Sequence, residues 1–182
     1  MMKRLFVAVP ISREIKEKII SLIQKLRNTE ADLKSVSLEN LHFTLKFLGK
    51  VEEDKIPEIV AKVMEIPSKP FSISLQGMGV FPSLERIKVV WAGINGPELI
   101  SLIKKINQSL NYIRRGEHEE SPHLTLARVK SGKNEEKLQR LVEKYKNTLF
   151  GEMRVEKMIL YESELGKAGP KYTKIKEFAF LG

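Results

Sequence analysis

The sequence predicts an α+β protein of two pseudo-symmetric lobes, each with an antiparallel-rich sheet and outer helices, and a cleft between them. Three observations lead to this fold class. The length of 182 residues suffices for one well-buried domain or for two small lobes that share an interface. The order strand–helix–strand–helix–strand occurs twice along the chain. The pattern His42-Phe43-Thr44-Leu45 returns as His123-Leu124-Thr125-Leu126 at the corresponding place in the second half.

The first half alternates short apolar runs with amphipathic segments. Leu5–Val9 is β-branched and aromatic, which predicts a strand. Ser12 is placed to cap a helix over Ile15–Leu26, where apolar residues recur at helical spacing. A polar link then leads to an alternating strand over Leu41–Leu48, which Gly49 is expected to end. A second helix is expected over Pro57–Ile66, and extended structure over Phe71–Leu75 and the GMGVF segment after it.

The second half follows the same order. Val89–Ile94 predicts a strand, and Pro97 stands at the expected start of a helix that includes Leu99–Leu110. After a polar stretch, His123–Val129 predicts another strand. The remaining expected elements are a helix over Glu135–Asn147 capped by Asn134, a strand over Val155–Tyr161, and a tail over Ser163–Gly182 whose apolar FAFL end docks as a final strand.

The two halves align with each other around the repeated motif, where LHFTLKFLG can be laid on PHLTLARVK. Such self-similarity indicates an internal duplication of a whole fold unit. Short strands separated by helices favour helices packed outside the sheets. We therefore expect one domain over residues 1–182, made of duplicated lobes at roughly 1–85 and 86–182, which could exchange terminal strands.

The composition limits the function classes. The absence of cysteine excludes disulfides, thiolate zinc sites and a cysteine nucleophile. The net charge of +9 favours polyanionic partners, although lysines that solvate a thermostable surface explain it equally well. No apolar stretch reaches the length of a transmembrane helix, and the apolar run near the N-terminus is too short for a signal peptide. We expect a cytoplasmic monomer that does not enter a membrane.

The two histidine motifs carry the strongest chemical signal. Because side chains alternate across a strand, His42 and Thr44 share one face, and His123 and Thr125 share one face in the second copy. The intervening apolar residues, together with Phe47 in the first copy, are expected to face the core. Equivalent strands in two lobes would then turn two imidazoles and two hydroxyls toward each other across the cleft.

This arrangement suits phosphodiester chemistry. Histidine has an ordinary pKa of ~6.5 and can act as acid or base near neutral pH, where each positioned proton transfer contributes about 10²–10⁴-fold. Thr44 and Thr125 are placed to hold the non-bridging oxygens. One such motif alone would usually be a packed or surface histidine, but two copies in register with a repeat favour function. No carboxylate or further histidine has metal-ligand spacing to either motif, and His118 reads as part of a solvated loop.

Beyond the motifs, the chain resembles the 2H phosphoesterase superfamily, and within it the RNA 2′,3′-cyclic phosphodiesterases, also called 2′-5′ RNA ligases. The resemblance covers nearly the whole chain, including RLFVAVPIS, LHFTLKFLG, GMGVFPSLERIKVVWAGI, SPHLTLARVK and LYESELGKAGPKYTKIKEFAFL. It implies hydrolysis of an RNA 2′,3′-cyclic phosphate end to a 2′-phosphomonoester, with no metal, cofactor or ATP. His42 would be the proton donor to the leaving 3′ oxygen, and His123 the proton acceptor that activates water. The reverse reaction at the same site could form a 2′-5′ linkage. An RNA end derived from tRNA is one candidate substrate.

Other residues are weaker candidates for substrate binding. Alternation puts Lys46 on the His42 face, where it either contacts phosphate or is a solvated lysine. The family often has a basic residue at Arg128, but strict alternation turns it away from His123, so a bulge would be needed.

Phe81, Trp91 and Tyr172 are aromatic candidates for stacking on an RNA base. Trp91 lies in an apolar strand and is expected in the core, which leaves Phe81 as the better candidate. Only the resemblance suggests that Ser163 and Tyr172 line the site. Two alternatives stay open, a cyclic phosphodiesterase for a small nucleotide from RNA processing and a non-catalytic module that binds RNA ends.

Overall fold

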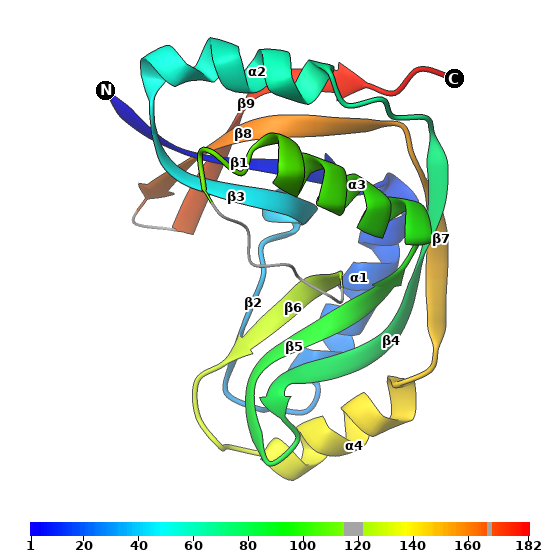
Figure 1. The fold of residues 1–182 in the computed structure, drawn as a ribbon. Coiled ribbons are helices and arrows are strands. Elements are labelled where there is room, and N and C mark those ends of the chain that lie inside the picture. The colour runs from blue at the N-terminus through cyan, green and yellow to red at the C-terminus, as the bar shows by residue number, and fades with distance from the viewer. Residues whose placement is uncertain (115–121, 167–168) are drawn as a thin grey trace.

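The computed structural model describes residues 1–114, 122–166 and 169–182, and shows two antiparallel sheets with four α-helices over these ranges (Figure 1). His118 lies outside the described residues. The first sheet has the order β3 (His42–Glu52), β1 (Met2–Pro10), β8 (Lys157–Gly166) and β9 (Gly169–Ala179). The second has the order β2 (Leu33–Ser35), β6 (His123–Val129), β5 (Arg86–Asn95), β4 (Phe71–Ser83) and β7 (Leu149–Val155). The helices are α1 (Arg13–Arg27), α2 (Ile56–Met64), α3 (Pro97–Ser109) and α4 (Glu135–Tyr145), and short 3-10 turns cover Leu38–Asn40 and Glu53–Lys55.

The predicted α+β fold class with two pseudo-symmetric lobes is confirmed. Each sheet takes strands from both halves of the chain, since β4 joins the second sheet while β8 and β9 join the first. The helices cross over as well, because α1 packs on β6 and β7, and α3 packs on β3. The division into duplicated halves at residue 85 stays a prediction. No helix in the described ranges has both the length and the apolar content needed to cross a membrane.

Helix α1 illustrates why these segments fold as they do. The Ser12 hydroxyl accepts a hydrogen bond from the backbone N–H of Ile15 at 3.3 Å, which satisfies a free donor of the first turn. The apolar stripe is buried, and burial of each large aliphatic side chain contributes about 1.5–3 kcal/mol. The stripe consists of Ile15, Ile19, Leu22, Ile23 and Leu26. All four helices lie where apolar spacing predicts them, with ends shifted by at most two residues.

Several boundaries differ from the sequence predictions. Gly49 does not end its strand: it adopts a φ of 74° beside an irregularity in the pairing of β3 with β1, and β3 continues to Glu52. The single strand expected over Val155–Tyr161 is two strands in different sheets, β7 and β8, which separate at Glu156. The tail forms β9 of the β8–β9 hairpin, and Phe178 and Phe180 of the FAFL segment are buried as expected.

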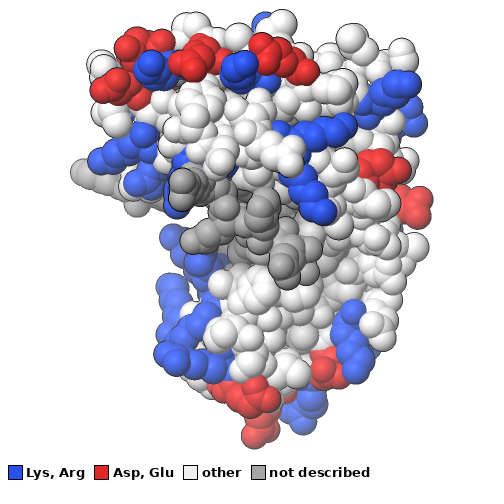
Figure 2. Space-filling model, viewed as in Figure 1, with Lys and Arg blue, Asp and Glu red and all other residues white. Residues whose placement is uncertain are grey.

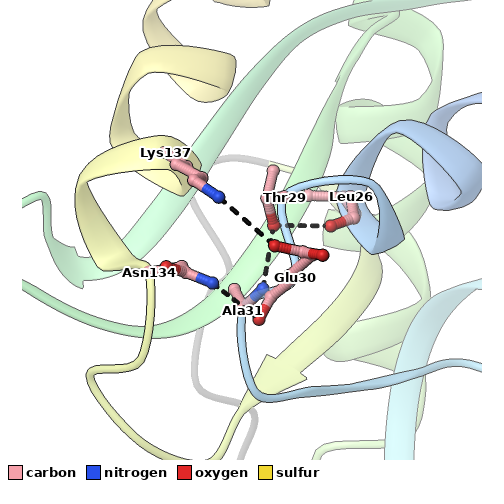
Figure 3. A network of polar contacts seen from close by, with 6 residues as sticks. All are labelled: Leu26, Thr29, Glu30, Ala31, Asn134 and Lys137. Atoms are coloured by element: carbon pink, nitrogen blue, oxygen red, sulfur yellow. Dashed lines mark hydrogen bonds and ion pairs between the residues drawn. The ribbon is translucent and has the colours of Figure 1, made fainter.

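The segment between α1 and β2 was expected to be a polar link, and it contains an ordered turn (Figure 3). Thr29 Oγ1 donates to the carbonyl oxygen of Leu26 and accepts from the backbone N–H of Ala31. Asn134 does not cap α4 with its side chain, and its Nδ2 instead donates to the Glu30 carbonyl at 3.0 Å. Lys137 Nζ adds an ion pair to Glu30 Oε2 at 3.3 Å. These contacts tie the start of α4 to the turn that precedes β2.

Candidate active site

The two histidine motifs contain matching β-bulges. The pairing of β3 with β1 skips Leu45, and the pairing of β6 with β5 skips Leu126. Each skipped residue is the leucine that follows the threonine of a His-x-Thr motif. An extra residue in one strand shifts the alternation of all side chains after it, so the faces beyond the two threonines cannot be read by counting.

His42 is half-buried at the first residue of β3. Its Nδ1 lies 2.6 Å from the backbone carbonyl oxygen of Asn40. A carbonyl oxygen only accepts, so Nδ1 carries a proton, and Nε2 is the nitrogen left for chemistry. Sequence reasoning missed this role of Asn40, because the two-residue contact depends on the turn that ends at Leu41.

Aromatic rings surround His42 on its face of the first sheet. The Phe6 ring centre is 4.8 Å away, and Tyr172 meets His42 edge-on at 5.1 Å with an interplanar angle of 82°. Tyr161 stacks on Phe6 at 5.3 Å. Burial lowers the pKa of His42 below its ordinary value, and the hydrogen bond to Asn40 opposes that shift. Phe6 and Tyr161 were also missed by sequence reasoning, because only the pairing of β1, β3 and β8 brings them together.

The lowered pKa of His42 gives a direct test. In an NMR titration, the ring protons of His42 are expected to show a midpoint below ~6.5. Tyr172→Ala opens the ring to water and should raise that midpoint, because hydration favours the imidazolium. The matched control is Phe81→Ala, which removes a ring beside the other histidine and should leave the His42 midpoint unchanged. An unshifted midpoint in Tyr172→Ala would show that this ring does not desolvate His42.

His123 has its own aromatic neighbours on the second sheet. Phe81 meets it edge-on at 4.9 Å, and the Trp91 ring centre lies 6.0 Å away. Trp91 packs over Gly79, where a Cβ atom would overlap the indole ring. The prediction that Trp91 is a core residue is wrong: it pairs with Thr125, shares the His123 face and is half-buried. Phe81 is 40% exposed beside it.

The bulge in β6 brings Arg128 to the His123 side. Arg128 pairs with Val89, and β5 runs without interruption from Gly93 through Trp91 to Val89. Residues that face each other across antiparallel strands share a side of the sheet, so exposed Arg128 lies on the face of His123. The bulge that Arg128 would need in order to lie on the His123 face is therefore present in β6.

The equivalent bulge in β3 has the opposite consequence for Lys46. Lys46 pairs with the core residue Val7, is only 4% exposed, and donates from Nζ to Asn107 Oδ1 of α3 at 2.8 Å. The prediction that Lys46 lies on the His42 face is wrong. Phe47, expected in the core, pairs instead with Phe6 and is 59% exposed on that face.

The remaining candidates lie on the two histidine faces. Thr44 and Thr125 are half-buried, and each is two residues from its histidine, before the bulge. Ser163 pairs with Tyr172 across β8 and β9 and is half-buried. The first sheet thus brings Tyr172 and Ser163 to the side of His42, and the second brings Phe81 and Arg128 to the side of His123.

The two histidine strands belong to different sheets and contact each other where the lobes meet (Figure 1). Figure 2 shows an indentation on one side of the molecule at this junction, with lysine and arginine side chains above and below it. Over the described ranges no group of three histidine or carboxylate side chains is arranged to hold a metal ion. The arrangement offers two imidazoles, two hydroxyls and surrounding positive charge, which together suit proton transfer at a phosphate ester.

Comparison with known proteins gives consistent matches over nearly the full chain. Residues 9–91 and 95–172 match the family described as LigT-like phosphoesterase. The RNA 2′,3′-cyclic phosphodiesterase of Methanocaldococcus jannaschii is 39% identical over 176 residues, covering 96% of this chain and 99% of that protein. The protein of the same name from Methanothermobacter thermautotrophicus is 38% identical, with 96% and 97% covered.

Solved structures agree with these matches. The protein TT0787 of Thermus thermophilus superimposes with a TM-score of 0.81 at 28% identity, covering 97% of both chains. Escherichia coli LigT in complex with 3′-AMP superimposes with a TM-score of 0.77 at 28% identity, covering 100% of this chain and 99% of that one.

Proposed function

Because this chain belongs to the LigT-like phosphoesterase family, we propose that it hydrolyses RNA 2′,3′-cyclic phosphate ends to 2′-phosphomonoesters. The observation that carries the proposal is the pair of His-x-Thr motifs, each at the start of a strand, on two sheets that meet at the lobe junction. Acid–base catalysis at a phosphate ester uses one group that accepts a proton and one that donates a proton, and two imidazoles are suited to these roles.

In the proposed reaction, water attacks phosphorus and the bond from phosphorus to the 3′ oxygen breaks. His123 accepts the proton of the attacking water, and His42 donates a proton to the departing 3′ oxygen. The Asn40 carbonyl supports this role of His42, since it holds the Nδ1 proton and leaves the Nε2 proton of the imidazolium for transfer. A bound phosphate anion favours the imidazolium and so offsets the effect of burial on the His42 pKa. Thr44 and Thr125 hydroxyls hold the non-bridging oxygens.

Four further residues fit substrate binding in this scheme. Arg128 is suited to a phosphate, and exposed Phe81 to stacking on a base. Tyr172 and Ser163 border the His42 side. Lys46 has no part in the scheme, because it points into the core.

The same groups could run the reaction backward, with a 5′-hydroxyl end as nucleophile, to form a 2′-5′ linkage. That reverse activity, a tRNA-derived substrate, a monomeric state and a cytoplasmic location stay predictions.

The proposal predicts turnover in the presence of a chelator. An oligonucleotide that ends in a 2′,3′-cyclic phosphate should be converted to the 2′-phosphate in excess EDTA, with a bell-shaped pH dependence that belongs to the coupled histidine pair. Chromatographic separation of 2′- and 3′-phosphate products is the measurement. Activity that disappears in EDTA and returns with a divalent ion would contradict the two-histidine mechanism, and salt-dependent binding without turnover would favour a module that only binds RNA ends.

A further inference from the structure

The two outer strands of the first sheet approach each other beside His42. In the order β3–β1–β8–β9, strands β3 and β9 are the edges, and the edges of a flat four-stranded sheet lie about 14 Å apart. Yet Asn40, which lies just before β3, donates from Nδ2 to the carbonyl oxygen of Pro170 in β9 at 2.9 Å. The rings of His42 in β3 and Tyr172 in β9 are only 5.1 Å apart. The sheet is therefore curled so that its edges close around His42.

Asn40 stands at this closure with three of its polar groups engaged. Its backbone N–H donates to the Ser37 carbonyl at 3.0 Å. Its own carbonyl oxygen accepts from His42 Nδ1, and its side chain donates to Pro170. The next residue, Leu41, is buried in the core. The peptide unit that faces the imidazole is thus held from both sides, and it cannot turn away without the loss of a hydrogen bond or of core packing.

We propose that Asn40 is a positioning residue for the proton donor: its side chain joins the β8–β9 hairpin to the turn before β3, and this fixes the carbonyl that orients the His42 imidazole. The inference rests on the proposed function and deepens it, because it explains how Nε2 is kept in place for transfer to the leaving oxygen. Asn40 acts only through His42 in this scheme and does not touch the substrate. A displacement of about 1 Å can cost a reaction about a hundredfold in rate, so such support matters.

The asparagine belongs to the first motif only. Asn40 stands two positions before His42, whereas the residue two positions before His123 is Ser121, which lies outside the described residues. The acceptor at Pro170 is 130 residues away along the chain, so no local pattern indicates the contact. The duplicated motifs therefore share the His-x-Thr pattern but not this asparagine, which agrees with different roles for the two imidazoles.

Gln139 of α4 offers a matched control. Its Nε2 donates to the carbonyl oxygen of Leu84 at 2.7 Å, so it too is a half-buried amide that joins segments distant in sequence. Helix α4 packs on the second sheet at the bottom of Figure 1, whereas the first sheet lies at the top. Gln139→Ala therefore removes a comparable hydrogen bond far from His42.

The first test measures turnover of cytidine 2′,3′-cyclic phosphate at the pH of maximal rate. We expect Asn40→Ala to lower kcat by about 10–100-fold with an unchanged KM, because the support acts on the transfer step. Asn40→Asp keeps the size of the side chain, but its carboxylate has no donor for Pro170, so it should show a similar loss. Gln139→Ala should keep the wild-type kcat. Full kcat in either Asn40 variant, or an equal loss in Gln139→Ala, would overturn the proposal.

A leaving group that needs no proton shows whether Asn40 acts through His42. When sulfur replaces the 3′ oxygen of the same substrate, a thiolate departs, so both His42→Ala and Asn40→Ala should regain much of their rate. A variant that is merely loosened in its fold would stay slow on both substrates. Recovery of His42→Ala without recovery of Asn40→Ala would therefore contradict a role through the proton donor.

The imidazole also gives a measurement that needs no turnover. In the neutral wild-type ring the proton should reside on Nδ1, which faces the Asn40 carbonyl. Nitrogen NMR shifts of the ring should show part of this proton population on Nε2 in Asn40→Ala, and none of this change in Gln139→Ala. An unchanged tautomer in Asn40→Ala would refute the positioning role. If the wild type turned over no cyclic phosphate, the proposed function would fail, while a changed tautomer in Asn40→Ala would still support the positioning of His42.

Discussion

Replacement of His42 or His123 by alanine is expected to lower kcat/KM for a cyclic phosphate substrate by about 10²–10⁴-fold. Each imidazole makes one proton transfer in the proposed transition state, and water at the same position is a poorly placed substitute. The double variant should fall little further than either single variant, because groups that act as a unit lose their effect together. Both rings are half-buried at strand starts, so far-ultraviolet circular dichroism should show an unchanged fold.

The two variants should differ in pH dependence. An acid must be protonated, so His42→Ala should abolish the fall in rate on the alkaline side, while His123→Ala should abolish the fall on the acidic side. A substrate with sulfur in place of the 3′ oxygen separates the roles further, because a thiolate leaves without a proton. This substrate should restore much of the rate of His42→Ala and little of the rate of His123→Ala. The reverse pattern would exchange the roles of acid and base, and full activity in either variant would end the proposal.

The second large effect concerns stability rather than activity. Asn107→Leu should destabilise the fold by about 1–3 kcal/mol or more, because the Lys46 ammonium would lose its acceptor while it remains buried. Asn107 also donates from Nδ2 to the Ile103 carbonyl at 3.0 Å, so its amide is fixed for this contact. A loss of this size corresponds to about 2–4 °C in Tm for each kcal/mol in a chain of this length.

The control is the double variant Lys46→Met with Asn107→Leu. It replaces both polar partners with apolar groups of similar volume, which is often neutral or stabilising, so most of the stability should return. Urea unfolding at constant m-value gives the free energies. Burial lowers the pKa of Lys46, so the unfolded chain binds that proton more tightly. The free energy of unfolding of the wild type should therefore increase as pH rises from the lowered pKa of Lys46 towards 10.5. Lys46→Met should not show this increase.

Lys46→Met also tests the position of this lysine. Because Lys46 points to α3 and away from His42, the single variant should keep the wild-type kcat for a cyclic mononucleotide. A large loss of kcat with an unchanged fold would mean that Lys46 contacts the substrate after all.

Local patterns in the sequence are sufficient to place the helices and the strands that carry the motifs, and to put His42 with Thr44, and His123 with Thr125, on one face of each strand. These properties are local, because helical spacing and two-residue alternation act within one segment. The duplicated motif also indicated an acid–base pair suited to phosphodiester chemistry, whereas the cyclic phosphate substrate and the roles of His42 and His123 were implied by the family resemblance.

The faces of the residues beyond the threonines depend on contacts between strands that are distant in sequence. A bulge turns Lys46 into the core and Arg128 to the face of His123, although both strands began with the same pattern. Pairing between distant strands likewise puts β4 in the second sheet and β8 in the first, and makes Lys34 the partner of Arg128. The position of a bulge, the register of two strands and the choice of sheet partner all depend on a neighbouring strand that is distant in sequence. Local periodicity therefore does not encode them.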